Sequence, residues 1–138
     1  MFDAVIVALL TIITVHAPRH DLVLEVARTE MQREHGLMDR KVLGAHTGML
    51  FVFDADEPVA FWMKDTLVPL DMIFIGADGR VRRVFANVPV VAPALADDRI
   101  PRESSSGKYV IELPAGEAAA DGIDAGIHLD LHGVPPAQ

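Results

Sequence analysis

The apolar residues of this sequence recur in short runs, many of them rich in β-branched residues, which is typical of strands rather than helices. Turns that contain proline, glycine or acidic residues separate these runs, and the acidic turn at 54–58 is one of them. The predicted strands cover residues 5–15, 22–26, 48–53, 59–66, 71–75, 80–85, 109–113 and 127–131. Turns at 17–21 and 76–79 are predicted to close two hairpins. The pattern therefore predicts a mostly β protein.

Helical signals are limited to two short segments. Thr29 and Gln32 have the spacing of a capping box, in which each side chain bonds a backbone amide at the helix start, and Gly36 can end that helix. Residues 116–121 are rich in alanine and are followed by Gly122, which predicts a small C-terminal helical turn. Because no internal repeat interrupts the pattern, residues 1–138 are predicted to form a single domain.

Two segments allow more than one interpretation. Residues 1–15 are either an N-terminal apolar strand or the remnant of a signal peptide, and Asp3 in place of a basic residue favours the strand. The apolar run is also shorter than the roughly 20 residues that a membrane span needs. Residues 86–107 contain three prolines and the serines 104–106, and are predicted to form a long Pro/Ser loop that gates a site.

Composition and charge narrow the classes of function. The chain has 138 residues, of which 51% are apolar, a net charge of −8 and no cysteine. The absence of thiols excludes disulfides, cysteine-ligated metals and cysteine nucleophiles. The acidic balance argues against binding to nucleic acid or to anionic lipid, and the sequence lacks the glycine-rich motifs that cradle nucleotide phosphates. Any activity must therefore rest on carboxylates, lysine or histidines.

The strongest candidate site is the group Trp62, Lys64, Asp65 and Asp71, with Arg40 as a further candidate. Asp71 lies between Leu70 and Met72, and burial of an unpaired acid is costly, so a partner is predicted for it. That partner is a cation such as Lys64, or a set of backbone amides. Three roles stay open for this group: a structural one, ligand binding with Trp62 as a platform, and acid–base catalysis.

Two further groups of residues are candidate sites, one apolar and one rich in histidine. Leu37, Met38, Met49, Phe51, Phe53, Phe61 and Met63 form an apolar block that is interpreted as core rather than as a pocket. His128, Asp130 and His132 would share one face of a terminal strand, where they could hold a metal but are expected to face solvent. His35 and His46 are predicted to lie at the surface. No metal site and no cofactor are therefore predicted.

The central residues carry a family resemblance. Phe61-Trp62-Met63-Lys64-Asp65-Thr66, followed by Pro69-Leu70-Asp71, resembles the signature of domain of unknown function family 192, and further blocks extend the resemblance over roughly residues 20 to 131. Two departures are Asp65, where the family usually has Asn, and Ile127, where it usually has Asp. The resemblance implies a mostly β single domain, a jelly-roll-like sandwich or a barrel. It also implies a periplasmic or other extracytoplasmic location, although a cytoplasmic one stays open, and no assigned activity.

The leading hypothesis is a non-enzymatic binding or accessory domain, with a ligand cleft near Trp62, Lys64 and Asp71 under the 86–107 loop. One alternative is an enzyme that uses Asp71 and Lys64 in acid–base chemistry. Another is a structural or protein-partner domain without a small-molecule site. The expected partners are a small molecule or a protein, with no nucleic acid and no membrane span, and the sequence leaves the oligomeric state open.

Overall fold

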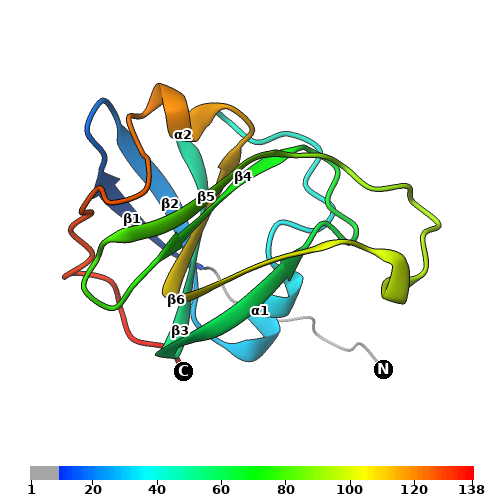
Figure 1. Cartoon of the computed structure of the whole chain (residues 1–138), viewed down its shortest axis with the longest axis horizontal. Helices are drawn as coiled ribbons and strands as arrows, with labels where there is room; N and C mark the ends of the chain where they lie inside the picture. The colour runs from blue at the N-terminus through cyan, green and yellow to red at the C-terminus, as the bar shows by residue number, and fades with distance from the viewer. Residues whose placement is uncertain (1–9) are drawn as a thin grey trace, which may run out of the picture.

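The computed structural model describes residues 10–138, which contain one six-stranded sheet, two short α-helices and a 3₁₀ turn (Figure 1). In chain order the elements are β1 (Thr11–His16), β2 (Asp21–Ala27), α1 (Glu30–His35), β3 (Thr47–Trp62), β4 (Leu70–Ile75), β5 (Val81–Val88), η1 (Asp97–Arg99), β6 (Arg102–Pro114) and α2 (Glu117–Ala120). The predicted mostly β fold is confirmed. No helix within this part of the chain is long and apolar enough to cross a membrane.

The strands lie in the order β1-β2-β3-β6-β4-β5, with β1 and β5 as open edges. The sheet therefore does not close, and the barrel alternative is wrong. All neighbouring strands are antiparallel except β2 and β3, which are parallel and are connected through α1. A parallel pair needs such a crossover because the chain must return to the same end of the sheet.

The two faces of the sheet are covered by two separate hydrophobic cores. Alternation along β6 shows the division, since Ile111 and Leu113 belong to the first core and Val110 to the second. The first core also receives α2 and the C-terminal segment, through Ala118, Leu129 and Leu131. The second core is rich in methionine and phenylalanine and lies on the same side of the sheet as α1.

Local sequence signals account for several element boundaries. Thr29 accepts a hydrogen bond from the backbone of Gln32, and the Gln32 side chain accepts one from the backbone of Thr29, so the capping box is confirmed. Gly36, with φ of +49°, ends α1. The turn between β1 and β2 is closed by a hydrogen bond from Ala17 to the carbonyl of His20. The predicted strand at 5–15 is present from Thr11, and its residues 5–9 lie outside the described part.

The structure corrects two predicted interruptions of strands. The acidic residues 54–58 lie inside β3, where a register shift between Val52 and Glu57 accommodates them and Asp56 pairs with Arg82. The loop predicted at 86–107 is shorter, because β5 continues to Val88 and β6 begins at Arg102. The serines 104–106 pair with residues 58–60 of β3. Backbone pairing between distant segments outweighs the local preference for turns at both places.

The predicted strand at 127–131 is also wrong, although its alternation is real. Leu129 and Leu131 are buried and His128 and Asp130 are exposed, but the segment makes only an isolated bridge, between His128 and Arg80. Its backbone instead bonds to the turn between β4 and β5, as in the hydrogen bond from Leu129 to the carbonyl of Gly79.

Candidate functional site

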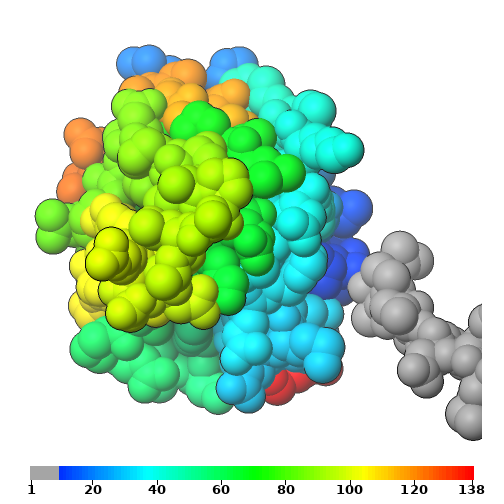
Figure 2. Space-filling view, turned by 90° about the vertical axis from the view of Figure 1, so that its right-hand side faces the viewer, coloured from blue at the N-terminus to red at the C-terminus, as the bar shows by residue number. Residues whose placement is uncertain are grey.

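The residues predicted to form one cleft do not lie together, and three of the five line two different hollows. Trp62 lines a pocket of about 300 Å³ next to α1, which we call the Glu112 pocket. Lys64 and Asp65 line a second hollow of about 350 Å³ beneath the connection 89–101, which we call the loop hollow. Asp71 and Arg40 line neither. Figure 2 shows the connection 89–101 (yellow-green) and the segment around α1 (cyan) on either side of a green band that contains the end of β3.

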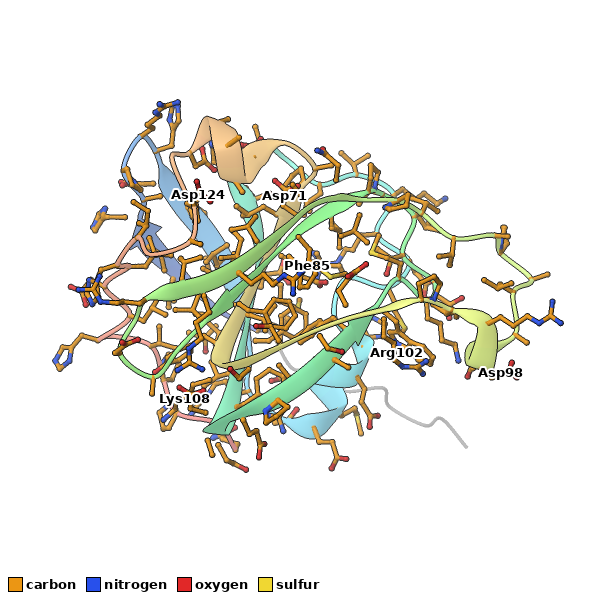
Figure 3. The ribbon with its side chains drawn as sticks, in the orientation of Figure 1. Asp71, Phe85, Asp98, Arg102, Lys108 and Asp124 are labelled. Carbon is orange, nitrogen blue, oxygen red and sulfur yellow. The ribbon has the colours of Figure 1, made fainter. Side chains whose placement is uncertain are left out.

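Asp71 is fully buried and is held by backbone amides. Its carboxylate accepts hydrogen bonds from the backbone N–H groups of Asn87 at 2.8 Å, Gly116 at 3.1 Å and Ala118 at 2.8 Å. Of the two kinds of partner predicted for this acid, a cation and backbone amides, the structure shows the backbone amides. These three hydrogen bonds join the end of β5 to the start of α2. In Figure 3, Asp71 lies beside α2 and away from Arg102 and Asp98.

Lys64 belongs to a cluster at the mouth of the loop hollow. Its ammonium group pairs with Asp97 at 3.0 Å and lies 5.2 Å from the centroid of the Trp62 ring. The Arg102 guanidinium lies 4.5 Å from the same ring, so Trp62 contacts two cations. Asp65 has a positive φ of 51°, a conformation that Asn and Asp tolerate better than other non-glycine residues.

Arg40 forms a partly exposed ion pair with Glu25 instead of joining Trp62 and Lys64. Its guanidinium donates to both carboxylate oxygens, at 2.9 and 2.6 Å. The hydrogen bonds from Arg40 lower the pKa of Glu25 below its ordinary value. This pair links β2 to the segment after α1.

The Glu112 pocket lies between the sheet and α1, and most of its wall is apolar. Phe51, Phe53 and Phe61 contribute edge-to-face contacts, with centroids 4.9 Å apart for Phe51 and Phe61 and 6.1 Å apart for Phe53 and Phe61. The full lining consists of Glu30, Arg33, Glu34, His35, Gly36, Leu37, Met38, Phe51, Phe53, Ala60, Phe61, Trp62 and Glu112. The block interpreted as core largely belongs to the second core, which contains Leu37, Met49, Phe51 and Met63 with Phe53 and Phe61 packed against it. Five of its residues also line this pocket: Leu37, Met38, Phe51, Phe53 and Phe61.

Glu112 is the buried acid of this pocket. It lies on β6 between Met49 of β3 and Met72 of β4, on the face of the second core, and is only 4% exposed. Burial raises the pKa of its carboxyl to about 8, and no neighbouring charge or hydrogen bond contributes to that shift. A carboxyl in this state is mostly neutral at pH 7 and can lose its proton when a cation enters.

Sequence reasoning did not select Glu112, although a usable signal exists. It is an acid between Ile111 and Leu113 in an apolar strand, which is the same pattern that singled out Asp71 between Leu70 and Met72. The sequence does not tell which of the two acids meets backbone amides.

The rim of the pocket is formed by charged residues of α1. The Arg33 guanidinium donates to the backbone carbonyl of Val52 at 3.0 Å and lies 5.3 Å from the Phe53 ring centroid, so it is fixed to the wall. Glu30 and Glu34 lie on the same helix and add two carboxylates to the lining. The rim therefore presents two carboxylates and one guanidinium next to aromatic rings.

Histidines gather at one corner of the protein, but not at the motif that the sequence singled out. The ligand atoms of His20, His46 and Asp121 lie within 4.8 Å of one another, whereas His128, Asp130 and His132 form no such group. His46, predicted at the surface, is half-buried and bonded to Asp121 at 2.6 Å.

Comparison with solved structures finds two similar proteins. One, from Sinorhizobium meliloti 1021 and described as a "putative transcription regulator", is 37% identical, with 85% of this chain and 89% of that chain covered and a TM-score of 0.73. The other, a protein of unknown function from Novosphingobium aromaticivorans DSM 12444, is 31% identical, with 88% and 84% covered and a TM-score of 0.73. No curated protein is significantly similar to the chain.

The family model DUF192, described as Uncharacterized ACR, matches residues 11–131, which include β1 to α2 and both hollows. The chain is therefore a member of family DUF192.

Proposed function

We propose that this protein is a non-enzymatic binding domain whose Glu112 pocket takes a small molecule with an apolar or aromatic body and one basic nitrogen. The observation that carries the proposal is the Glu112 carboxyl, which is only 4% exposed, lines an aromatic pocket and has its pKa raised to about 8 by burial. A ligand that supplies a charged donor to such a carboxyl gains affinity there.

The chemistry of the pocket favours a cation over a neutral ligand. Because the pKa of Glu112 is about 8, the carboxyl ionises near neutral pH at a cost of roughly 1.4 kcal/mol per pH unit below that value. An ammonium group beside it would recover this cost in a site of low dielectric. Glu30 and Glu34 add negative charge at the rim, and Phe61 adds an aromatic ring. The Phe53 and Trp62 rings are already in contact with cations of the protein, Arg33 on the first and Lys64 and Arg102 on the second.

The size of the pocket favours a small ligand. Its volume of about 300 Å³ is at the lower end of the range for small-molecule sites, about 300 to 1,000 Å³. A single aromatic or aliphatic ring with an aminomethyl group is of suitable size. The accessory role and the extracytoplasmic location stay predictions that rest on the family resemblance, and cell fractionation tests the location.

Calorimetry with three probes of similar shape tests the proposal: benzylamine, benzyl alcohol and benzoate. Benzylamine is expected to bind and the other two to bind at least about tenfold more weakly, which corresponds to about 1.4 kcal/mol. Glu112→Gln removes the ionisable group and should abolish this preference. The matched control is Glu103→Gln, which changes an acid on the same strand outside the pocket and should bind benzylamine as the unmodified protein does.

Two results would contradict the proposal. Equal affinity for benzylamine and benzyl alcohol would remove the argument for a basic nitrogen. No binding of any of the three, in a protein whose circular dichroism is native, would remove the argument for a ligand pocket of this chemistry.

The absence of nucleic-acid binding also stays a prediction. The net charge of −8, with Arg40 and Arg82 engaged in ion pairs, does not favour contact with phosphates. Fluorescence anisotropy with a labelled DNA duplex at low salt should show no change, and a salt-dependent increase would contradict the prediction.

A further inference from the structure

Two histidines and two acids lie together at a corner of the protein, and none of the four lines the Glu112 pocket. His20 lies in the turn between β1 and β2, His46 lies just before β3, and Glu117 and Asp121 lie on and just after α2. Figure 1 shows this turn (blue) next to α2 (orange), and a hydrogen bond of 3.1 Å from the backbone of Arg19 to the carbonyl of Asp121 ties them together. Three separate parts of the chain thus converge at one place.

The imidazoles and carboxylates of this corner are close enough to share one ion. The ligand atoms of His20, His46 and Asp121 lie within 4.8 Å of one another, and Glu117 Oε2 lies 3.2 Å from His46 Nδ1. The rings of His20 and His46 are stacked, with centroids 4.1 Å apart.

Two carboxylate oxygens at this corner are buried and make no hydrogen bond within the described residues. Asp121 is fully buried, and while its Oδ1 is bonded to His46, its Oδ2 has no hydrogen bond to any described residue. Glu117 Oε2 is likewise buried without a hydrogen bond, and its polar neighbour is His46 Nδ1 at 3.2 Å. Buried carboxylate oxygens without a hydrogen bond are destabilising, and a cation bound between them would relieve this cost.

We propose that His20, His46 and Asp121 bind a divalent transition-metal ion of the zinc class, with Glu117 as a further oxygen ligand. Two imidazole nitrogens and carboxylate oxygens, with no sulfur, form a donor set that suits Zn²⁺ better than Ca²⁺ or Mg²⁺, which prefer oxygen alone. His20 is exposed, so the ion can enter from solvent. The ion would hold the β1–β2 turn against α2 and stabilise the folded state by mass action.

The test is titration of Zn²⁺ into the untagged, EDTA-treated full chain, followed by calorimetry and thermal unfolding. Zn²⁺ is expected to bind with a stoichiometry of one and to raise the melting temperature, and Mg²⁺ at the same concentration is expected to do neither. Co²⁺ as a spectroscopic probe should give the visible absorption of a site with nitrogen ligands. Equal effects of Zn²⁺ and Mg²⁺, or no binding of Zn²⁺ in large excess, would overturn the proposal.

Variants at exposed histidines locate the site without disturbing the core. His20→Asn should weaken Zn²⁺ binding by about tenfold or more, since even loss of a residue that only supports a ligand has an effect of 10- to 100-fold. The matched control is His16→Asn on the same hairpin, where His16 pairs with Asp21 at the surface, and its affinity should be unchanged. Unchanged affinity in His20→Asn, or loss of binding in His128→Asn or His132→Asn instead, would overturn the assignment.

Discussion

Asp71 and Glu112 are two acids buried on neighbouring strands, yet their surroundings differ completely. Asp71 lies on β4 opposite Leu113, and Glu112 lies on β6 opposite Met72, so the two side chains occupy opposite faces of the sheet. Three backbone amides surround the carboxylate of Asp71, whereas the Glu112 carboxyl lines an aromatic pocket and has its pKa raised by burial. Burial alone therefore does not identify a functional acid, and the hydrogen bonds that compensate for the burial distinguish the two.

The largest expected difference comes from making the same change, carboxylate to amide, at both acids. Asp71→Asn should lower the free energy of unfolding by about 3 to 5 kcal/mol, because it removes charge-assisted hydrogen bonds and brings a donor toward backbone amides. Glu112→Gln should instead raise it by about 2 kcal/mol at pH 6, because the folded protein keeps a proton there that the unfolded chain has released. Urea unfolding at pH 6 measures both. Equal losses in the two variants would contradict the comparison, and exposed Asp98→Asn provides a baseline near zero.

The pH dependence of stability sharpens the comparison. The pKa of Glu112 is raised from its ordinary 4.5 to about 8 in the folded protein, so the folded state holds an extra proton between these values. Stability must then fall as pH rises through this window, by up to roughly 1.4 kcal/mol per pH unit. Glu112→Gln lacks this loss, so it should become the more stable protein by a few kcal/mol at pH 9. Parallel stability curves of the two proteins from pH 5 to 9 would contradict a raised pKa.

A smaller effect is expected when Glu112 is replaced by an apolar side chain of similar length. Glu112→Met should raise the free energy of unfolding by about 1 to 2 kcal/mol at pH 5, since it removes a buried carboxyl from a core of methionine and phenylalanine. Thermal unfolding measures the gain. A loss of stability would mean that the carboxyl has a stabilising partner in the folded protein.

The smallest effect is expected at an acid that is paired but partly exposed. Glu25→Gln breaks the ion pair with Arg40 and should cost less than about 1 kcal/mol, because solvent screens charges at the surface. Because Arg40 lowers the pKa of Glu25, this contribution is present above the ordinary pKa and is lost as pH falls below it. Urea unfolding at pH 7 and pH 3 should show a larger difference between the proteins at pH 7 than at pH 3. A cost close to that of Asp71→Asn would remove the distinction between buried and exposed acids.

Much of the fold could be predicted from local patterns, and the errors have a common cause. The capping box at Thr29 and the hairpin turns depend on residues close in sequence, and these predictions are confirmed. The serines 104–106 and the acids at 54–58 resemble turns locally, but they pair with distant strand segments or side chains. Such pairing is decided by the whole sheet, which no local pattern contains.

The candidate site was less predictable for a related reason. The need of Asp71 for a partner was predicted, but whether amides, Lys64 or a ligand would meet it depends on where α2 and β5 end. Glu112 likewise lies between apolar residues of its strand. Only the folded structure shows that its carboxyl lines a pocket and that burial raises its pKa. His20 and His46 were separated by the chain and brought together by the β1–β2 turn and the start of β3.

The central pairing of β3 with β6 has a consequence for how the protein acquires its structure. It places Met49 opposite Glu112, so the chain must close a loop that contains β4, β5 and the connection 89–101 before the sheet is continuous. Closing such a loop loses conformational entropy before the contacts that compensate for it can form. The protein has the high contact order of slow-folding β proteins, and it should fold in milliseconds to seconds rather than microseconds.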